Sequence, residues 1–185
     1  MVLKDVEIRV VALESKKHVS KNGDIGVVEV KGPNVFQGYW KQPEKTKSEF
    51  KDDGFFVTGD MGYLDQDQYL TIVGRNKDLI ITGGLNVYPK EIEAIIDKDS
   101  NVDESAVIGV SHPDFGEGIV AVIVEKKGHK LDQQVLQEEL KKNLATFKLP
   151  KTIHIVKELP RNTMGKVQKN VLRDLYKDEF RKANK

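Results

Sequence analysis

At 185 residues the chain is long enough for one ordinary domain, or for a small domain together with part of another. Its 30 basic and 29 acidic residues leave a formal net charge of +1, which argues against nucleic acid or a membrane surface as the main partner. The absence of cysteine excludes disulfides and thiolate metal sites. No apolar run approaches the roughly 20 residues that span a bilayer, and the N-terminus shows no signal-peptide core. We therefore expect a soluble, cytoplasmic protein, or an organellar one if a targeting segment lies upstream.

The first part of the chain has the pattern of β-structure. Apolar and charged residues alternate as they do in half-buried strands, and an Asn-Gly turn signal lies within Lys21–Asp24. Pro43–Phe50 predicts a short helix that has Pro43 in its first turn. The expected strands are Val6–Val11, Gly26–Lys31, Phe55–Val57, Met61–Leu64 and Tyr69–Val73.

A charged break at Gly74–Asp78 separates this β-rich segment from a region in which strands and helices alternate. We place a domain boundary there, with residues 1–75 in one domain and residues 76–185 in the other. Directly after the break, Gly83 and Gly84 lie between two short apolar runs and predict a small hairpin. Pro89 then begins a helix at the first position, which proline favours.

Beyond the hairpin the pattern predicts three strands and three helices. The strands are expected at Ser105–Val110, Ile119–Val124 and Thr152–Leu159, and a loop at His112–Gly118 joins the first two. Asp132 is expected to cap the second helix, and the last helix is expected to begin near Lys166. The buried helix residues are expected to be Ile92, Ile95, Ile96, Val135, Leu136, Leu140, Leu144, Val167, Val171, Leu172 and Leu175. The second domain is therefore α+β, with a three-stranded sheet, a small hairpin and flanking helices.

Four segments carry a recognisable pattern. They are Pro33-Asn-Val-Phe-Gln-Gly-Tyr-Trp40, Gly84-Leu-Asn-Val-Tyr-Pro-Lys-Glu-Ile-Glu93, His112-Pro-Asp-Phe-Gly-Glu-Gly118 and Leu159-Pro-Arg-Asn-Thr-Met-Gly-Lys-Val-Gln-Lys-Asn-Val-Leu172. Together with Phe56-Val-Thr-Gly-Asp60 and the longer run from Gly74 to Glu93, they resemble in this order the C-terminal part of the adenylate-forming enzymes, which include acyl-CoA synthetases, peptide-synthetase adenylation domains and luciferases. The resemblance extends from about Val6 to the final helix. The sequences of the four segments are most similar to the malonyl-CoA synthetase subgroup.

The resemblance implies an acid–thiol ligase that works in two steps. ATP and a carboxylic acid, here malonate or a similar acid, give an acyl-adenylate and pyrophosphate, and the thiol of CoA then displaces AMP. A small C-terminal domain rotates on a hinge between the steps. The family's Gly/Ser/Thr-rich phosphate loop and most of its acid pocket are not found in these 185 residues. We therefore expect the tail of a large domain plus a complete small domain, inactive by itself, with Met1 an alternative or artificial start.

By the same resemblance, Asp60 and Arg75 bind the ribose of ATP. A carboxylate can accept hydrogen bonds from two ribose hydroxyls, and the planar guanidinium suits ribose or phosphate oxygens. The residues alone leave other interpretations open. Asp60 follows Gly59 and fits a β-turn, and Arg75 fits a surface position at the end of a strand.

The segment between the two domains also carries expected roles. By resemblance Lys77 is the hinge, and the Gly83-Gly84 loop lies along the pantetheine arm of CoA, where glycine permits a close backbone approach. The alternatives are a charged linker and an ordinary two-glycine turn. Glu93 is interpreted either as a residue matched to the helix dipole or as a polar contact during thioester formation.

Lys166 is the residue to which the resemblance assigns catalysis. Its amine would stabilise the charge that builds on the α-phosphate and the carboxylate during adenylation, whereas most lysines are solvated surface charges. Asn162 or Thr163 is expected to cap the following helix and so to direct the lysine. Lys169 and Arg173 are interpreted as the solvated face of that helix, with contact to the phosphates of CoA as the alternative.

No metal site is expected in the chain, because its histidines do not have the spacing of metal ligands and Mg²⁺ would arrive with ATP. Asp114 and Glu117 are assigned to turn or capping roles. Two other functions stay open. One is a non-catalytic module that binds a partner or a carrier protein, and the other is a different branch of the superfamily, such as a peptide-synthetase adenylation domain or a fatty acyl-AMP ligase.

Overall fold

The computed structural model describes residues 4–13 and 22–181, so the expected start at Met1 and one of the four histidines, His18, lie outside the described residues. The chain divides into two compact units, Met1–Lys77 (unit 1) and Asp78–Lys185 (unit 2). Among the described helices, none is long and apolar enough to cross a bilayer. That unit 1 belongs to a larger domain stays a prediction.

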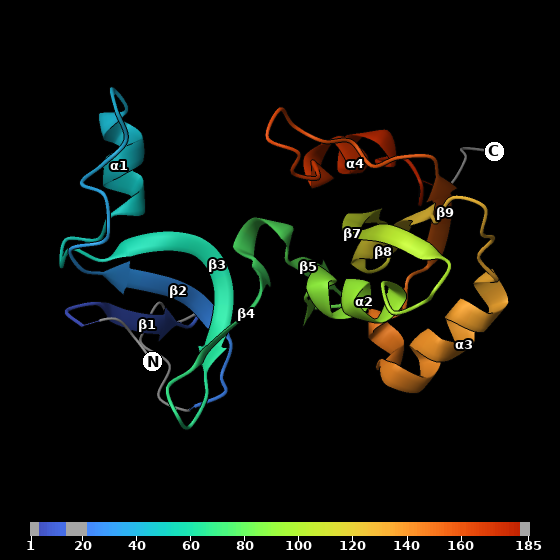
Figure 1. Ribbon diagram of the computed structural model, residues 1–185, viewed down its shortest axis with the longest axis horizontal. Coiled ribbons are helices and arrows are strands. Elements are labelled where there is room, and N and C mark those ends of the chain that lie inside the picture. Colours follow the sequence, from blue (N-terminus) through green and yellow to red (C-terminus); the bar gives the residue numbers. More distant parts are fainter. Residues whose placement is uncertain (1–3, 14–21, 182–185) are drawn as a thin grey trace. The chain divides into compact units, whose positions relative to one another are not determined.

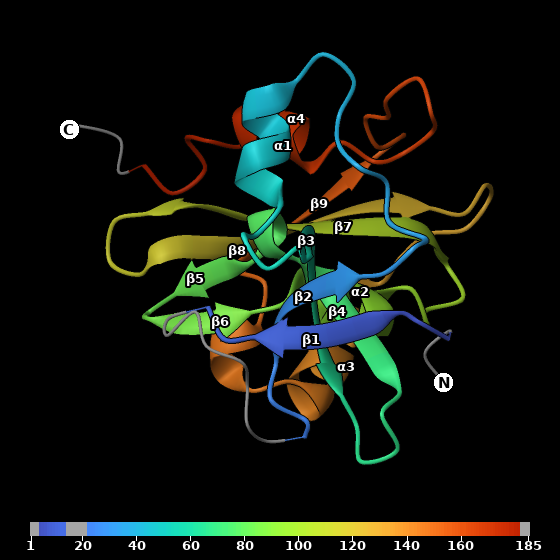
Figure 2. The ribbon, with the colours of Figure 1, turned by 90° about the vertical axis from the view of Figure 1, so that its left-hand side faces the viewer.

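Unit 1 is built on an antiparallel sheet whose strands follow the order of the chain, β1-β2-β3-β4. Figure 2 shows β1 and β2 as neighbouring arrows of opposite direction. Val10, Val28 and Met61 are buried in its core. A short helix, α1, contains Pro43 in its first turn, as the sequence predicts. The bounds are β1 Glu7–Val11, β2 Gly26–Lys31, α1 Pro43–Glu49, β3 Phe56–Leu64 and β4 Leu70–Arg75.

The two strands expected at Phe55–Val57 and Met61–Leu64 are one continuous strand, β3. Gly59 lies in its middle with a φ of 73°, a conformation that glycine adopts without steric cost. The strand continues through this residue, because Val57 pairs with Glu29 and Met61 pairs with Val27, with a register shift between the two pairs. Asp60 is paired with Arg75 across β3 and β4, so the interpretation of Asp60 as a turn residue is wrong.

Unit 2 is a mixed structure of short helices around one sheet, which confirms the α+β prediction. A 3₁₀ turn, η1, spans the division between the two units. The bounds are η1 Asn76–Asp78, β5 Ile80–Thr82, β6 Leu85–Val87, α2 Pro89–Ile96, β7 Val102–His112, β8 Gly116–Glu125, α3 Gln133–Asn143, η2 Thr146–Lys148, β9 Thr152–Val156 and α4 Lys169–Leu175.

The sheet of unit 2 has five strands in place of the expected three. Strands β7 and β8 form a long antiparallel pair, and β9 lies parallel to β8. The β5–β6 hairpin joins the edge of β8 through a bridge between Thr82 and Gly116. The expected loop at His112–Gly118 shrinks to a tight turn, because β7 runs to His112 and β8 starts at Gly116.

Both faces of this sheet are covered, as Figure 1 shows: α2 and α3 lie on one side of β7 and β8, and α4 lies on the other. Ile119, Ala121 and Ile123 belong to the core on the side of α2 and α3, while Val120 and Val122 belong to the core on the side of α4. The central strand is therefore apolar at consecutive positions. Each fully buried Val or Ile contributes roughly 1.5–3 kcal/mol relative to an exposed one.

The helices follow the sequence with four corrections, which concern the start of the last helix and the exposed side chains of Val135, Val171 and Leu175. Asp132 caps α3 as expected, because its carboxylate accepts hydrogen bonds from the backbone N–H groups of Gln134 and Val135. The side chain of Val135, expected to be buried, is 57% exposed. The last helix begins at Lys169 and not near Lys166, and Leu175 is exposed on it. Of the residues expected to be buried in the last helix, only Leu172 is fully buried.

Candidate functional site

Lys166 lies in a small closed loop that precedes α4, which we call the lysine loop (residues 161–167). A β-bridge between Arg161 and Val167 closes the loop. Below it, the backbone N–H of Gln168 donates to the carbonyl oxygen of Pro160 at 2.8 Å. Within it, the N–H of Asn162 donates to the carbonyl oxygen of Lys166 at 2.9 Å. The backbone of Lys166 is therefore fixed although it lies outside any helix.

Asn162 orders the inside of this loop. Its side-chain oxygen accepts hydrogen bonds from the N–H of Met164 at 3.0 Å and of Lys166 at 2.9 Å. The prediction that Asn162 or Thr163 caps the following helix is wrong, because α4 starts only at Lys169 and its N-cap residue is Gln168. The side chain of Asn162 bonds within the loop instead. Asn162 therefore helps to fix the backbone of Lys166.

The side chain of Lys166 contrasts with its backbone. The residue is exposed, and within the described part of the chain no carboxylate lies at ion-pair distance from its amine. A lysine amine in this state keeps its freedom to move. The loop thus presents a cation that can be offered to an anionic ligand.

Two cations that follow the lysine loop have partners inside unit 2. The amine of Lys169 lies 2.5 Å from the carboxylate of Glu93, and the guanidinium of Arg173 lies 2.6 Å from that of Asp78. Glu93 is 6% exposed and also accepts a hydrogen bond from the N–H of Val107 at 2.9 Å. The interpretation of Lys169 and Arg173 as a solvated face is therefore wrong. Both hold α4 against the rest of the unit.

Asp60 and Arg75 come together in unit 1. The Nε of Arg75 lies 2.8 Å from the Oδ1 of Asp60, and its Nη1 donates to the carbonyl oxygen of Thr58 at 3.2 Å. The side chains are 30% and 52% exposed for Asp60 and Arg75. The hydroxyl of Thr58 also accepts from the N–H of Asp60. A carboxylate and a guanidinium are thus held side by side and open to a ligand with hydroxyl groups.

The glycine pair forms the expected hairpin turn. Gly83 and Gly84 have φ values of 57° and 79°, the left-handed conformation of a two-residue hairpin in which glycine is favoured. The N–H of Gly83 donates to the carbonyl oxygen of Phe115 at 2.8 Å. Nearby, burial raises the pKa of the Tyr88 phenol above its usual range.

Glu117 has a structural role that differs from the expected one. It belongs to β8, and its carboxylate accepts a hydrogen bond at 2.7 Å from the N–H of Ile81 in the glycine hairpin. Asp114 does lie in a turn, where its N–H bonds to the ring of His112. Lys77 lies in η1 and is exposed. Among the described residues, no group of His, Asp and Glu side chains could hold a metal ion.

The chain is similar to a known protein family and to several known proteins. Residues 91–166 match the model of the AMP-binding enzyme C-terminal domain. The 2-succinylbenzoate–CoA ligase of Geobacillus kaustophilus is 41% identical over 152 residues, which are 82% of this chain and 31% of the relative. The oxalate–CoA ligase of Saccharomyces cerevisiae is 36% identical over 179 residues, which are 96% of this chain and 33% of the relative. The crystal structure of ATP-bound MatB from Rhodopseudomonas palustris is 59% identical with a TM-score of 0.89, over 97% of this chain and 35% of that one.

The chain belongs to the adenylate-forming acyl-CoA synthetase superfamily. It spans about a third of the length of the relatives it matches. The matched C-terminal model ends at Lys166. The superfamily assignment confirms the resemblance and the fold. The roles expected for Asp60, Arg75, Lys77, Gly83, Gly84 and Lys166 stay predictions.

Proposed function

We propose that this chain is the C-terminal part of an ATP-dependent carboxylic acid–CoA ligase, and that Lys166 is its adenylation lysine. The observation that carries the proposal is the contrast at Lys166 between a backbone held by Asn162 and an amine that is exposed and unpaired within the described residues. A pinned backbone limits where the charge can reach, and an unpaired amine is available to a substrate.

In the proposed first half-reaction, an oxygen of the acid attacks the α-phosphorus of ATP and pyrophosphate leaves. Negative charge then builds on the α-phosphate while the carboxylate approaches it. The amine of Lys166 can contact oxygens of both groups, because an ammonium is a compact charge with three donors. A preorganised cation of this kind lowers the barrier without reorganisation of solvent.

In the proposed second half-reaction, the thiol of CoA attacks the acyl carbon of the adenylate, loses its proton, and AMP leaves. The amine of Lys166 has no part in this step, which requires a different face of unit 2. The glycine hairpin is the proposed contact for the pantetheine arm, since its exposed turn carries no Cβ at Gly83 or Gly84. Lys77, beside the division between the units, is the proposed hinge.

Asp60 and Arg75 fit the ribose of ATP. One oxygen of Asp60 is bonded to Arg75, and the carboxylate retains acceptor capacity for a ribose hydroxyl. The bond from Arg75 fixes the direction of the carboxylate. We propose that Mg²⁺ arrives with ATP, whose phosphates it would bridge.

Malonate is the proposed acid. The support is the 59% identity to MatB, a malonyl-CoA synthetase, against 41% and 36% for the relatives named for 2-succinylbenzoate and oxalate. The test is ATP–pyrophosphate exchange by the full-length protein with malonate, oxalate and 2-succinylbenzoate. Exchange that favours either of the other acids rejects malonate and leaves the ligase intact.

The decisive variant is Lys166→Ala in the full-length protein. We expect adenylation to fall roughly 100- to 1000-fold, the usual cost of one such electrostatic contact. Thioester formation from preformed malonyl-adenylate and CoA should change little.

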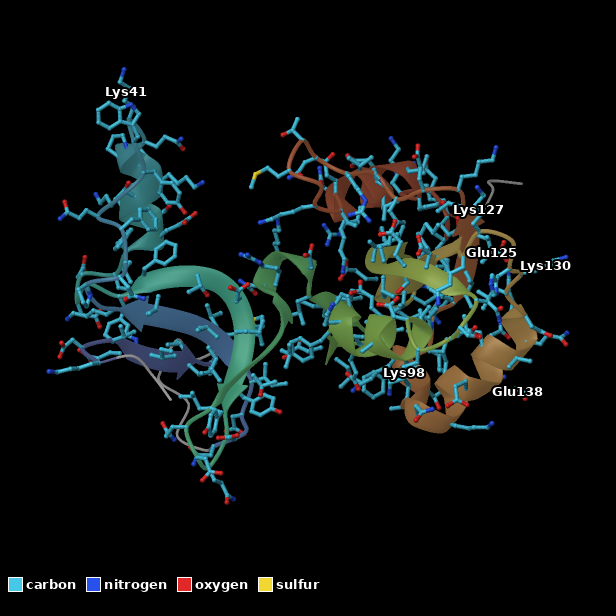
Figure 3. All side chains as sticks on the ribbon, in the orientation of Figure 1. Lys41, Lys98, Glu125, Lys127, Lys130 and Glu138 are labelled. Carbon is cyan, nitrogen blue, oxygen red and sulfur yellow. The ribbon has the colours of Figure 1, made fainter. Side chains whose placement is uncertain are left out.

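Lys130→Ala is the matched control, because Lys130, which is labelled in Figure 3, is an exposed lysine of the same unit. Equal losses in both half-reactions would reject the proposed role. No exchange by the wild-type protein with any acid would favour a non-catalytic module.

A further inference from the structure

The guanidinium of Arg161 connects the lysine loop to the sheet of unit 2. Its Nη1 donates to the carbonyl oxygen of Gly165 at 2.6 Å, and its Nη2 forms an ion pair with Glu104. Glu104 belongs to β7, the long strand that is paired with β8 along most of its length. One side chain therefore links the residue that precedes Lys166 to the most extensively paired part of the sheet.

The two hydrogen bonds around Lys166 act on one peptide plane. Arg161 holds its oxygen, on Gly165, and Asn162 holds its N–H, on Lys166 at 2.9 Å. Because a peptide group is planar, fixing both its donor and its acceptor fixes the position of the Cα of Lys166 and the direction of its N–Cα bond. The carbonyl side of Lys166 is held as well, because its oxygen accepts a hydrogen bond from the N–H of Asn162 at 2.9 Å. Gly165 has a φ of 77°, so the loop adopts this plane in a conformation that glycine allows.

An arginine suits this position better than a lysine would. The planar guanidinium offers several donors in a rigid fork and can serve a carbonyl and a carboxylate at once. The pair is also partly exposed, at 45% for Arg161 and 26% for Glu104, and partly exposed ion pairs contribute little to global stability. Its main effect is therefore local, on the lysine loop.

We propose that Arg161 is a positioning residue for Lys166: it anchors the peptide plane before the lysine to Glu104 and so sets where the amine can reach. The inference rests on the proposed adenylation role of Lys166. It concerns an arginine to which the sequence assigns no role, and it predicts a defect confined to one half-reaction.

The test uses Arg161→Met in the full-length protein, a substitution that keeps an unbranched stem and removes the fork. Adenylation measured by pyrophosphate exchange should fall about 10- to 100-fold, because misplacement of a catalytic group by about 1 Å can cost 100-fold. The KM for ATP and thioester formation from preformed acyl-adenylate should stay within about twofold, since neither depends on a group that acts only in the adenylation transition state.

Two further variants separate the contacts. Arg161→Lys keeps the charge but reaches only one partner at a time, so we expect a smaller loss than in Arg161→Met. Glu104→Gln keeps the bond to Gly165 and weakens the anchor on β7, so we expect a loss as well. Arg181→Met is the matched control, because it removes another arginine–carboxylate pair of unit 2, with the exposed Asp178, and should leave both half-reactions unchanged.

A second measurement does not depend on activity. Hydrogen exchange of the full-length protein should be faster in Arg161→Met at the amides of the lysine loop, by about tenfold or more, while β7 and β8 keep their protection. Unchanged exchange in the loop, or equal losses in the two half-reactions, would overturn the proposal. If Lys166→Ala abolishes adenylation and Arg161→Met does not, positioning by Arg161 is rejected and the proposed function stands. If Lys166→Ala retains adenylation, the proposed role of Lys166 and the positioning role built on it are rejected together, even where the loop exchanges faster, and the proposed ligase activity stands.

Discussion

Lys166 and Lys169 belong to the same short motif, and the structure uses them in opposite ways. Lys166 has a fixed backbone and an exposed amine, whereas the amine of Lys169 lies 2.5 Å from the buried carboxylate of Glu93. The side chain of Lys169 is 18% exposed. Two lysines so close in sequence therefore have different jobs, one in the proposed chemistry and one in the fold. The role of a lysine in a motif therefore depends on the residues that it contacts.

The free energy of unfolding of variants at Lys166 and Lys169 tests this contrast most directly. We expect Lys169→Ala to lower the free energy of unfolding of unit 2 by about 2 kcal/mol, because it leaves the Glu93 carboxylate buried without its cation. Lys166→Ala should change the same quantity by less than about 0.5 kcal/mol. Urea unfolding of the 185-residue chain, followed by hydrogen exchange in β7 and β8, provides the measurement. Equal effects of the two substitutions would remove the distinction.

The Asp60–Arg75 pair is an intermediate case, since its side chains are paired with each other and still partly exposed. We expect Asp60→Asn to raise the KM for ATP about tenfold in the full-length protein, through loss of a charged acceptor for the ribose. Asp53→Asn is the matched control, because Asp53 forms a comparable exposed pair with Arg9 in unit 1. A similar rise in both variants would mean that Asp60 acts through the fold.

The glycine hairpin should show the smallest effect. Gly84→Ala meets no atom within 4 Å of the added Cβ, but its φ is +79°. The cost is therefore conformational, and we expect about 1 kcal/mol of lost stability. Gly74→Ala also enters open space, without a positive φ, and should be near neutral. Thermal unfolding of the two variants compares them directly, and a neutral Gly84→Ala would show that the turn can relax.

Local signals in the sequence predicted several elements correctly. Asp132 caps α3, Pro89 lies at the start of α2 and the glycine pair makes a hairpin. Each of these depends on residues within a few positions of one another. The ordered motifs, of which the one around Lys166 is the last, also identified the superfamily, and the site roles stay predictions.

Contacts between distant residues account for what the sequence did not predict. Glu93 and Lys169 are 76 positions apart, and nothing local marks either as a partner of the other. The same holds for Arg161 and Glu104, which are 57 positions apart. The continuity of β3 through Gly59 was also missed, because a glycine before an aspartate usually signals a turn. The pairing of β3 with β2 on both sides of Gly59 shows that the strand continues.

The attachment of the glycine hairpin has a consequence for variation among relatives. Its position is set by a backbone bridge between Thr82 and Gly116, by the bond from Gly83 to the carbonyl of Phe115, and by Glu117. The outward side chains of Ile81 and Leu85 take no part in these bonds and are 51% and 47% exposed. Evolution can therefore exchange those two side chains, and with them the surface shown to a passing ligand, while the loop itself keeps its place.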